Sequence, residues 1–163
     1  CWPSARALAG FLEQHPEYIR GKRVLELAAG LALPSLVAAG YAAQVTASDH
    51  APEAVDIIRL SVQRSGIANM TASIIDWNDR VELTEKDVLL LSDVNYAERD
   101  FERLYALVRE CMDKRITVIL ATPQRLQAKP FMESLMEWRV YGTELEAGNE
   151  WITVWVLENL VMG

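Results

Sequence analysis

Several residue types that mark particular protein classes are scarce in this chain of 163 residues. It contains two cysteines, Cys1 and Cys111, and two histidines, which is too few to indicate a disulfide framework or a cysteine–histidine metal site. No apolar run approaches the roughly 20 residues that a membrane-spanning helix needs. The first residues also lack a secretory signal, since Glu13 interrupts the apolar pattern. These absences predict a cytoplasmic protein that binds no metal and no membrane.

Positive charge is also in short supply. The chain has 16 Lys and Arg against 23 Asp and Glu, a formal net charge of −7 at pH 7. Non-specific affinity for nucleic acid comes mainly from Lys and Arg at the phosphates, so this balance argues against a nucleic-acid partner and favours a basic protein or a small molecule. The hydrophobic fraction of 51% excludes a disordered chain, and the length fits one domain, residues 1–163. The sequence leaves the oligomeric state open.

Apolar periodicity alternates between strand-like and helix-like segments along most of the chain. Ala5, Leu8 and Leu12 share one face of an N-terminal helix over residues 4–15. Short apolar runs then predict strands, and the stretches between them predict helices, one of which begins at Pro52 and ends at Gly66. Residues 78–86 are polar and leave little room for a helix. The expected strands are 24–28, 44–48, 70–75, 88–91 and 116–121, and the other expected helices are 33–40, 97–113 and one around 131–136.

The last part of the chain departs from this alternation. Residues 139–146 and 151–157 are rich in β-branched and aromatic side chains and flank the turn sequence Ala147-Gly148-Asn149-Glu150, which predicts an antiparallel hairpin. Alternating β/α units predict a parallel sheet with helices on both faces. We therefore expect an α/β, Rossmann-like doubly wound sheet of seven strands, mostly parallel, with a C-terminal antiparallel hairpin. A dinucleotide dehydrogenase would continue with parallel units instead.

Ligands of open parallel sheets bind beyond the carboxyl ends of the strands, so the residues that follow each strand are candidates for a site. Small residues around Gly30 follow the first strand and allow a ligand to lie against the backbone, although a tight strand-to-helix turn is the alternative. Asp49 follows Gly30 by 19 residues, a spacing at which a carboxylate can accept hydrogen bonds from both hydroxyls of a ribose. The alternative role of Asp49 is an ordinary helix N-cap.

Asp76 and Trp77 end the third expected strand. A carboxylate or backbone group at this place can bind the amino group of an adenine, and the aromatic ring can cover the base. Core packing explains Trp77 at least as well. His50 can stack on the same base, but a lone histidine beside a helix start is more often structural.

A polar cluster follows the fourth expected strand directly. Ser92, Asp93, Asn95 and Tyr96 supply a hydroxyl, an acid, an amide and a phenol after four apolar residues. Polar clusters at strand ends in such sheets usually face a ligand, so we expect these residues beside a reacting group. The alternative is a loop that caps the next helix.

Together these residues resemble the seven-β-strand S-adenosylmethionine-dependent methyltransferases, in particular the lysine methyltransferase family labelled methyltransferase family 16. The resemblance covers nearly the whole chain, and its most specific motif is Asp-x-x-Tyr, at Asp93-Val94-Asn95-Tyr96. The family commonly has glycine where this chain has Ala28 and Ala32, and alanine resists a positive φ. The other matching segments are Trp2-Pro3-Ser4-Ala5, Val24-Leu25-Glu26-Leu27-Ala28-Ala29-Gly30, Asp49, Asp76-Trp77, and Pro123-Gln124-Arg125 followed by Phe131.

The resemblance implies S-adenosyl-L-methionine as the cofactor and S-adenosyl-L-homocysteine as its product. It divides the chain into a cofactor half over residues 22–77 and an acceptor-side half over residues 87–163. The residues implied for catalysis are Asp93, Asn95 and Tyr96. The residues implied for cofactor binding are Trp2, Glu26, Ala28, Ala29, Gly30, Leu31, Asp49, His50, Asp76, Trp77 and Ser92.

We therefore expect an N-methyltransferase that acts on an amine, and the resemblance implies a protein lysine as the acceptor. The acidic composition agrees with a basic protein substrate. A small-molecule, nicotinamide-like N-methyltransferase is the alternative within the same enzyme class. A non-catalytic binding module is the alternative outside it, motivated by the alanines of the first motif.

Overall fold

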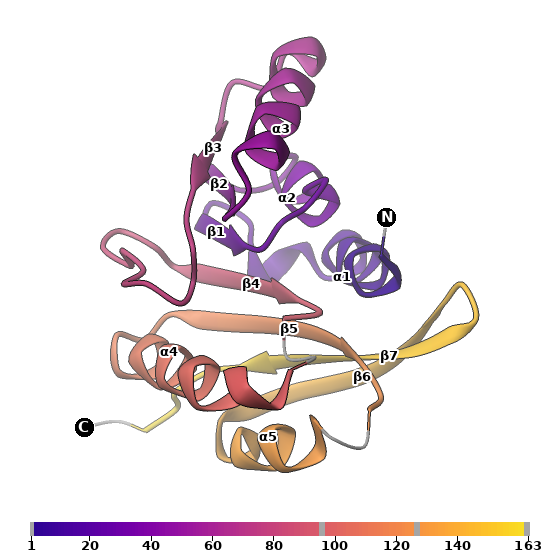
Figure 1. Ribbon diagram of the computed structural model, residues 1–163, viewed down its shortest axis with the longest axis vertical. Helices are drawn as coiled ribbons and strands as arrows, with labels where there is room; N and C mark the ends of the chain where they lie inside the picture. Colours follow the sequence, from indigo (N-terminus) through magenta and orange to yellow (C-terminus); the bar gives the residue numbers. More distant parts are fainter. Residues whose placement is uncertain (1, 95–96, 126–127, 162–163) are drawn as a thin grey trace.

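A seven-stranded mixed sheet forms the centre of the molecule in the computed structural model, which describes residues 2–94, 97–125 and 128–161 (Figure 1). The strand order is β3-β2-β1-β4-β5-β7-β6. The strands are β1 (Arg23–Leu27), β2 (Gln44–Asp49), β3 (Met70–Ile74), β4 (Val88–Ser92), β5 (Thr117–Pro123), β6 (Arg139–Ala147) and β7 (Glu150–Leu157). The helices are α1 (Pro3–Gln14), α2 (Leu33–Ala38), α3 (Pro52–Ser65), α4 (Phe101–Asp113) and α5 (Lys129–Ser134), with short 3-10 turns at Pro16–Tyr18, Glu98–Asp100 and Met136–Trp138.

The directions of the strands follow the expected topology. Strands β3, β2, β1, β4 and β5 are parallel, whereas β7 lies antiparallel between β5 and the edge strand β6. Gly148, with a φ of 63°, forms the turn of the β6–β7 hairpin, a conformation that glycine adopts at little cost. The expected Rossmann-like sheet with a C-terminal hairpin is therefore confirmed.

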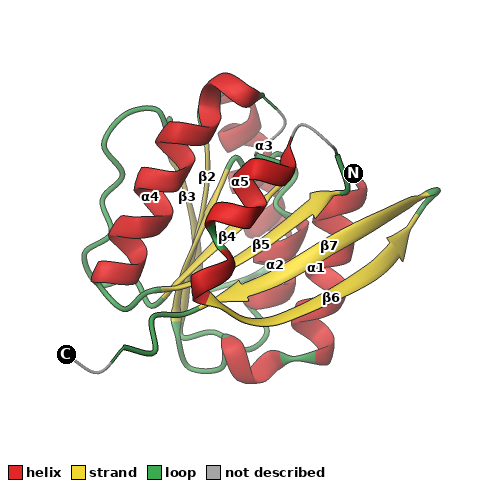
Figure 2. Cartoon of the chain, turned by 90° about the horizontal axis from the view of Figure 1, so that it is seen from below, coloured by secondary structure: helices red, strands yellow, loops and turns green. Residues whose placement is uncertain are grey.

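Helices cover the two faces of the sheet unequally (Figures 1 and 2). Alternate residues of β4 show why both faces are buried: Val88 and Leu90 belong to one core with α1, α2 and α3, while Leu89 and Leu91 belong to a second core with α4 and α5. Residues 75–87, which connect β3 to β4 and are all described, contain no helix, as expected from the polar stretch 78–86. Val81 and Leu83 of that stretch are nevertheless buried and complete the second core.

The boundaries of some elements differ from the expectations. The helix expected over 97–113 begins with the 3-10 turn Glu98–Asp100, and α2 ends at Ala38 because the chain turns at Gly40, whose amide bonds the carbonyl of Val37. Strand β5 extends to Pro123, since its pairing with β7 continues as far as Ile152. Within the described residues, no helix has the length and apolar character needed to cross a bilayer.

Candidate active site

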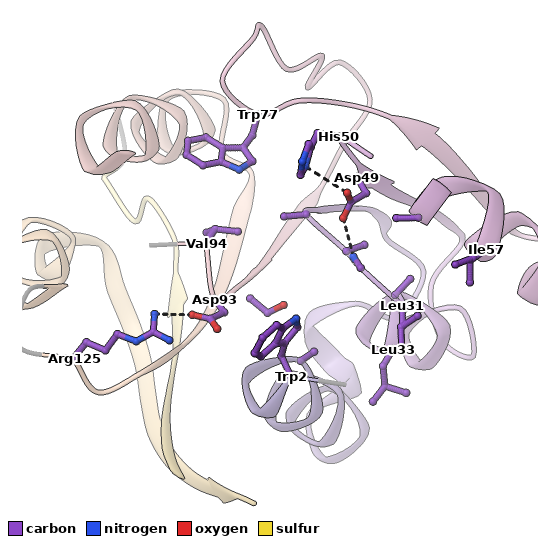
Figure 3. A pocket seen from close by; sticks show the side chains of 17 residues that line it. Trp2, Leu31, Leu33, Asp49, His50, Ile57, Trp77, Asp93, Val94 and Arg125 are labelled. Carbon is purple, nitrogen blue, oxygen red and sulfur yellow. Dashed lines mark hydrogen bonds and ion pairs between the residues drawn. The ribbon is translucent and has the colours of Figure 1, made fainter. Parts of the chain in front are cut away.

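A cavity of about 1020 Å³ opens at the carboxyl ends of β1, β2 and β4, close to the start of α1 (Figure 3). This volume is at the upper end of the roughly 300–1,000 Å³ typical of ligand pockets. Ten of the fourteen residues implied by the sequence line it: Trp2, Ala28, Ala29, Gly30, Leu31, Asp49, His50, Trp77, Ser92 and Asp93. The other lining residues are Ala5, Ala32, Leu33, Ala54, Ile57, Val94 and Arg125, which the sequence reasoning did not assign to the site.

The loop between β1 and α2 forms one wall of this cavity. Ala28, Gly30 and Ala32 adopt left-handed backbone conformations with φ values of 53°, 56° and 60°. The amide of Ala29 donates to the carbonyl of Ser48, which ties the loop to β2. At Gly30 nothing lies within 4 Å of the position that a Cβ would take, so the backbone faces open space. The two alanines thus adopt the backbone shape that glycine favours, at a conformational cost of about 1 kcal/mol each.

Asp49 connects this loop to the start of α3. One carboxylate oxygen (Oδ2) accepts a hydrogen bond from the Gly30 amide at 3.0 Å, and the other accepts one from the Ala51 amide at 3.0 Å. The N-cap of α3 is Ala51, so the alternative that Asp49 is itself the N-cap is wrong. A carboxylate has about four acceptor sites, and Asp49, which is 8% exposed, therefore retains capacity for a ligand in the cavity.

Glu26 lies behind the cavity wall and is absent from the residues that line it. Its Oε1 atom accepts hydrogen bonds from the hydroxyl and the amide of Ser35 at 2.6 and 3.2 Å, near the start of α2. Its Oε2 atom is buried and has no hydrogen-bond partner among the described residues. Burial raises the pKa of Glu26 to about 8, against the opposing effect of the Ser35 hydrogen bonds. The structure therefore places Glu26 as a support of the loop rather than on the cavity surface.

The end of β3 contributes one lining residue rather than two. Trp77 lines the cavity and also packs against the second core. Core packing and a place beside the ligand are therefore compatible for this residue. Its carbonyl accepts a hydrogen bond from Nε of Arg103 on α4 at 3.2 Å. Asp76 instead accepts hydrogen bonds from Asn78 and does not line the cavity. The carboxylate of Asp76 thus stabilises a turn with Asn78.

His50 and Trp2 lie at the rim of the cavity. The His50 ring is 71% exposed, and its Nδ1 atom lies 3.4 Å from Oδ1 of Asp49. Trp2 precedes α1 and is 75% exposed. Both rings are therefore accessible to a ligand, and Figure 3 shows them on different sides of the opening.

Asp93 follows β4, lines the cavity and has a left-handed backbone with a φ of 54°. Its Oδ1 atom lies 3.0 Å from Nη1 of Arg125, which follows β5 (Figure 3). Burial raises the pKa of Asp93; Arg125 opposes this effect and Glu150 adds to it. Sequence reasoning missed Arg125 as a site residue, although the match after the fifth strand included it. Asn95 and Tyr96, the other two residues implied for catalysis, lie outside the described residues.

The chemistry of these walls fits the cofactor that the resemblance implies. An S-adenosyl compound presents a ribose diol, an aromatic base and a charged amino-acid end. The cavity offers the remaining acceptor sites of Asp49, the ring of Trp77, the apolar side chains of Leu31 and Ile57, and the open backbone at Gly30. No group of three or more His, Cys, Asp or Glu side chains in the described part of the chain is arranged to hold a metal.

Known proteins share this sequence pattern and this fold. The chain is 32% identical over 142 residues to the human histone-arginine methyltransferase METTL23, a match that covers 83% of this chain and 75% of the relative. It spans about half the length of the frog, rat and mouse proteins of that name. It is also 36% identical over 104 residues to the calmodulin-lysine N-methyltransferase of Arabidopsis thaliana, covering 58% of this chain and 34% of that protein.

A solved structure supports the fold independently. The N-methyltransferase NodS from Bradyrhizobium japonicum, crystallised with S-adenosyl-L-homocysteine, superposes with a TM-score of 0.76 at 13% identity, covering 96% of this chain and 87% of that one. The family model described as lysine methyltransferase matches residues 1–138. These findings confirm the expected S-adenosylmethionine-dependent methyltransferase class, and the chain belongs to the lysine methyltransferase family.

Proposed function

We propose that this chain transfers a methyl group from S-adenosyl-L-methionine to the side-chain amine of a protein lysine. The observation that carries the proposal is the position of Asp93. Its carboxylate and the glycine-containing loop line the same cavity from different sides, so an acceptor and a cofactor can meet between them (Figure 3). The sulfonium methyl of the cofactor is already activated, and the protein therefore has mainly to align the acceptor with it.

The cofactor would be held by residues that follow β1, β2 and β3. The ribose hydroxyls would donate to Asp49, and the adenine would lie against Trp77, with His50 at its exposed edge. The loop Ala28–Leu31 would lie along the cofactor, with Ser92 and Trp2 closing the cavity.

Glu26 would act indirectly, through Ser35 and the start of α2. Asp76 would act indirectly, through the turn that it forms with Asn78 next to Trp77.

The acceptor would be held by Asp93, together with Asn95 and Tyr96 of the same motif. A lysine ammonium, with a pKa near 10.4, must lose a proton to solvent before its nitrogen can bond the methyl carbon, as the methyl–sulfur bond breaks and S-adenosylhomocysteine leaves. Asp93 would accept a hydrogen bond from the amine and orient its lone pair, and its charge would stabilise the positive charge that develops on nitrogen during transfer.

A basic protein substrate is supported by the negative charge of the β6–β7 hairpin. The β6–β7 hairpin reaches the cavity side of the sheet, since Ile152 of β7 pairs with Pro123 at the carboxyl end of β5. The hairpin carries exposed acidic side chains, and one of them acts on the pKa of Asp93. These side chains are Glu144, Glu146 and Glu150. We also propose that residues 1–163 work as one domain, and that the protein acts in the cytoplasm, where the buried thiol of Cys111 stays reduced.

Arginine methylation is the second candidate, because several relatives are named histone-arginine methyltransferases. The test is transfer of tritiated methyl groups into purified core histones and into calmodulin, followed by acid hydrolysis and separation of methyl-lysine from methyl-arginine. Label in methyl-lysine that is lost in Asp93→Asn supports the proposal. Label in methyl-arginine supports the second candidate. Label confined to small molecules of an added cell extract would point to the small-molecule alternative, and cofactor binding with no label in any fraction to the binding module.

A further inference from the structure

The ion pair between Asp93 and Arg125 lines the cavity beside the ends of β4 and β5. Among the described lining residues, Arg125 is the one lysine or arginine. The sheet holds both partners in place: Ser92 pairs with Ala121, and the Asp93 amide donates to the Ala121 carbonyl at 2.9 Å. Arg125 approaches Oδ1 of Asp93 to 3.0 Å, and in Figure 3 Asp93 lies between Arg125 and Trp2.

One oxygen of this carboxylate remains for a ligand. Within the described residues, Asp93 Oδ2 receives no hydrogen bond, whereas Oδ1 is held by Arg125. A guanidinium binds a carboxylate best through two parallel hydrogen bonds, one to each oxygen. An amine is a compact group that needs only one acceptor atom. The pair as it stands therefore matches an amine and leaves no second oxygen for the fork of an arginine side chain.

The charge of Arg125 acts in the same direction. An isolated carboxylate would favour the protonated form of a nearby amine, which cannot accept a methyl group. Arg125 offsets the negative charge of Asp93, so Oδ2 can accept a hydrogen bond from the amine without holding it as an ammonium. A guanidinium cannot lose its proton to relieve the repulsion from Arg125.

We propose that Arg125 is a specificity-determining residue, which selects an amine over a guanidinium by holding one oxygen of Asp93. This inference rests on the proposed function, because it assumes that Asp93 receives the acceptor. It adds that the choice between lysine and arginine depends on Arg125, which follows β5 and lies outside the Asp-x-x-Tyr motif.

Two small cations test the proposal without catalysis. Butylamine represents the lysine side chain and propylguanidinium the arginine side chain. Both are cations in solution at pH 8, so loss of the Arg125 charge favours both, and the ratio of their affinities reports the second oxygen of Asp93. Their dissociation constants would be measured by NMR titration at pH 8, with the protein saturated with S-adenosylhomocysteine. In Arg125→Met both oxygens of Asp93 become available, and the affinity ratio should move toward propylguanidinium by about tenfold or more, as expected for one added charge-assisted hydrogen bond. Arg125→Gln, a gentler change for folding, should move it the same way by a smaller factor.

Two controls separate this role from general destabilisation. Arg23 forms a similar ion pair with Asp87 at the opposite end of β1, with Nε 3.0 Å from Oδ2, so Arg23→Met should leave the ratio unchanged. Arg125→Lys keeps a positive charge beside Oδ1 and should stay within about threefold of the wild-type ratio.

An unchanged ratio in Arg125→Met and Arg125→Gln, with S-adenosylhomocysteine bound, overturns the role of Arg125 alone. A wild-type protein that does not bind S-adenosylhomocysteine overturns the proposed function and this inference with it.

Discussion

The buried carboxyl of Glu26 should make the stability of this protein depend strongly on pH. Its pKa is raised to about 8 from an ordinary 4.5, so the folded protein holds a proton on Glu26 over a range where the unfolded chain has lost it. The contribution of Glu26 to the free energy of unfolding should therefore be largest below pH 4.5. It should fall as the pH rises toward 8 and change no further above that pH. A difference of about 3.5 pKa units corresponds to as much as about 5 kcal/mol.

Glu26→Gln isolates this contribution. Glutamine keeps an oxygen for the hydroxyl and amide of Ser35 and places an uncharged amide where Oε2 is buried without a hydrogen-bond partner among the described residues. We expect the variant to match the wild type within about 1 kcal/mol at pH 5 and to exceed its stability by several kcal/mol at pH 8.5. The assay is urea unfolding followed by circular dichroism at five pH values from 5 to 9.

The control for this series is Glu82→Gln. Glu82 is an exposed carboxylate whose pKa is lowered by hydrogen bonds from Thr84, so its titration falls below the measured range. The difference between Glu82→Gln and the wild type should stay constant from pH 5 to 9. If the difference between Glu26→Gln and the wild type is equally constant, Glu26 ionises normally and the argument from its burial is wrong.

Three other predictions concern the cavity. Ala28→Gly should stabilise the fold by roughly 0.5–1 kcal/mol, because glycine accepts the left-handed φ, whereas Ala106→Gly in the exposed part of α4 should cost about 1 kcal/mol; thermal unfolding checks both signs. Asp49→Ala should weaken S-adenosylhomocysteine binding by roughly 1.5–3 kcal/mol in calorimetry, and unchanged affinity would limit Asp49 to its two amide contacts. Asp93→Asn should lower methyl transfer about 100-fold or more while cofactor affinity changes less than tenfold, and comparable losses in both would contradict its assignment to the acceptor.

The fold could be predicted from the sequence because its buried strands are short and nearly uniform in polarity. Val88 to Leu91 is apolar at every position, as a strand covered on both faces must be, and it lies at the centre of the sheet. The hairpin followed from Gly148, whose positive φ makes the turn. The polar stretch 78–86 was rightly expected to lack a helix, but nothing in its pattern indicated that Val81 and Leu83 would be buried under the second core.

The parts of the site that the sequence did not reveal depend on contacts between distant segments. Arg125 meets Asp93 only because β4 and β5 are paired with Ser92 beside Ala121, and spacing along the chain carries no record of that register. Glu26 belongs to the strand whose carboxyl end forms the cavity, and its motif implied a cofactor contact. In the structure its side chain accepts a hydrogen bond from Ser35 instead. The sequence thus located Glu26 in the correct strand, but it did not show that the side chain points away from the cavity.

The alanines of the first motif bear on whether the chain is an enzyme or only a binding module. The non-glycine residues with positive φ in the described chain are Ala28, Ala32, Glu85, Asp93 and Arg115, and three of these five line the cavity. Backbone strain of this kind persists where the surrounding structure requires a particular shape, and it clusters at functional sites. Because Ala28 and Ala32 hold the conformation that glycine would take, the substitutions reduce stability and leave the path of the loop intact. The left-handed conformation that the family's glycines would allow is thus present with alanine, and the departure from glycine gives no ground for a loss of catalysis.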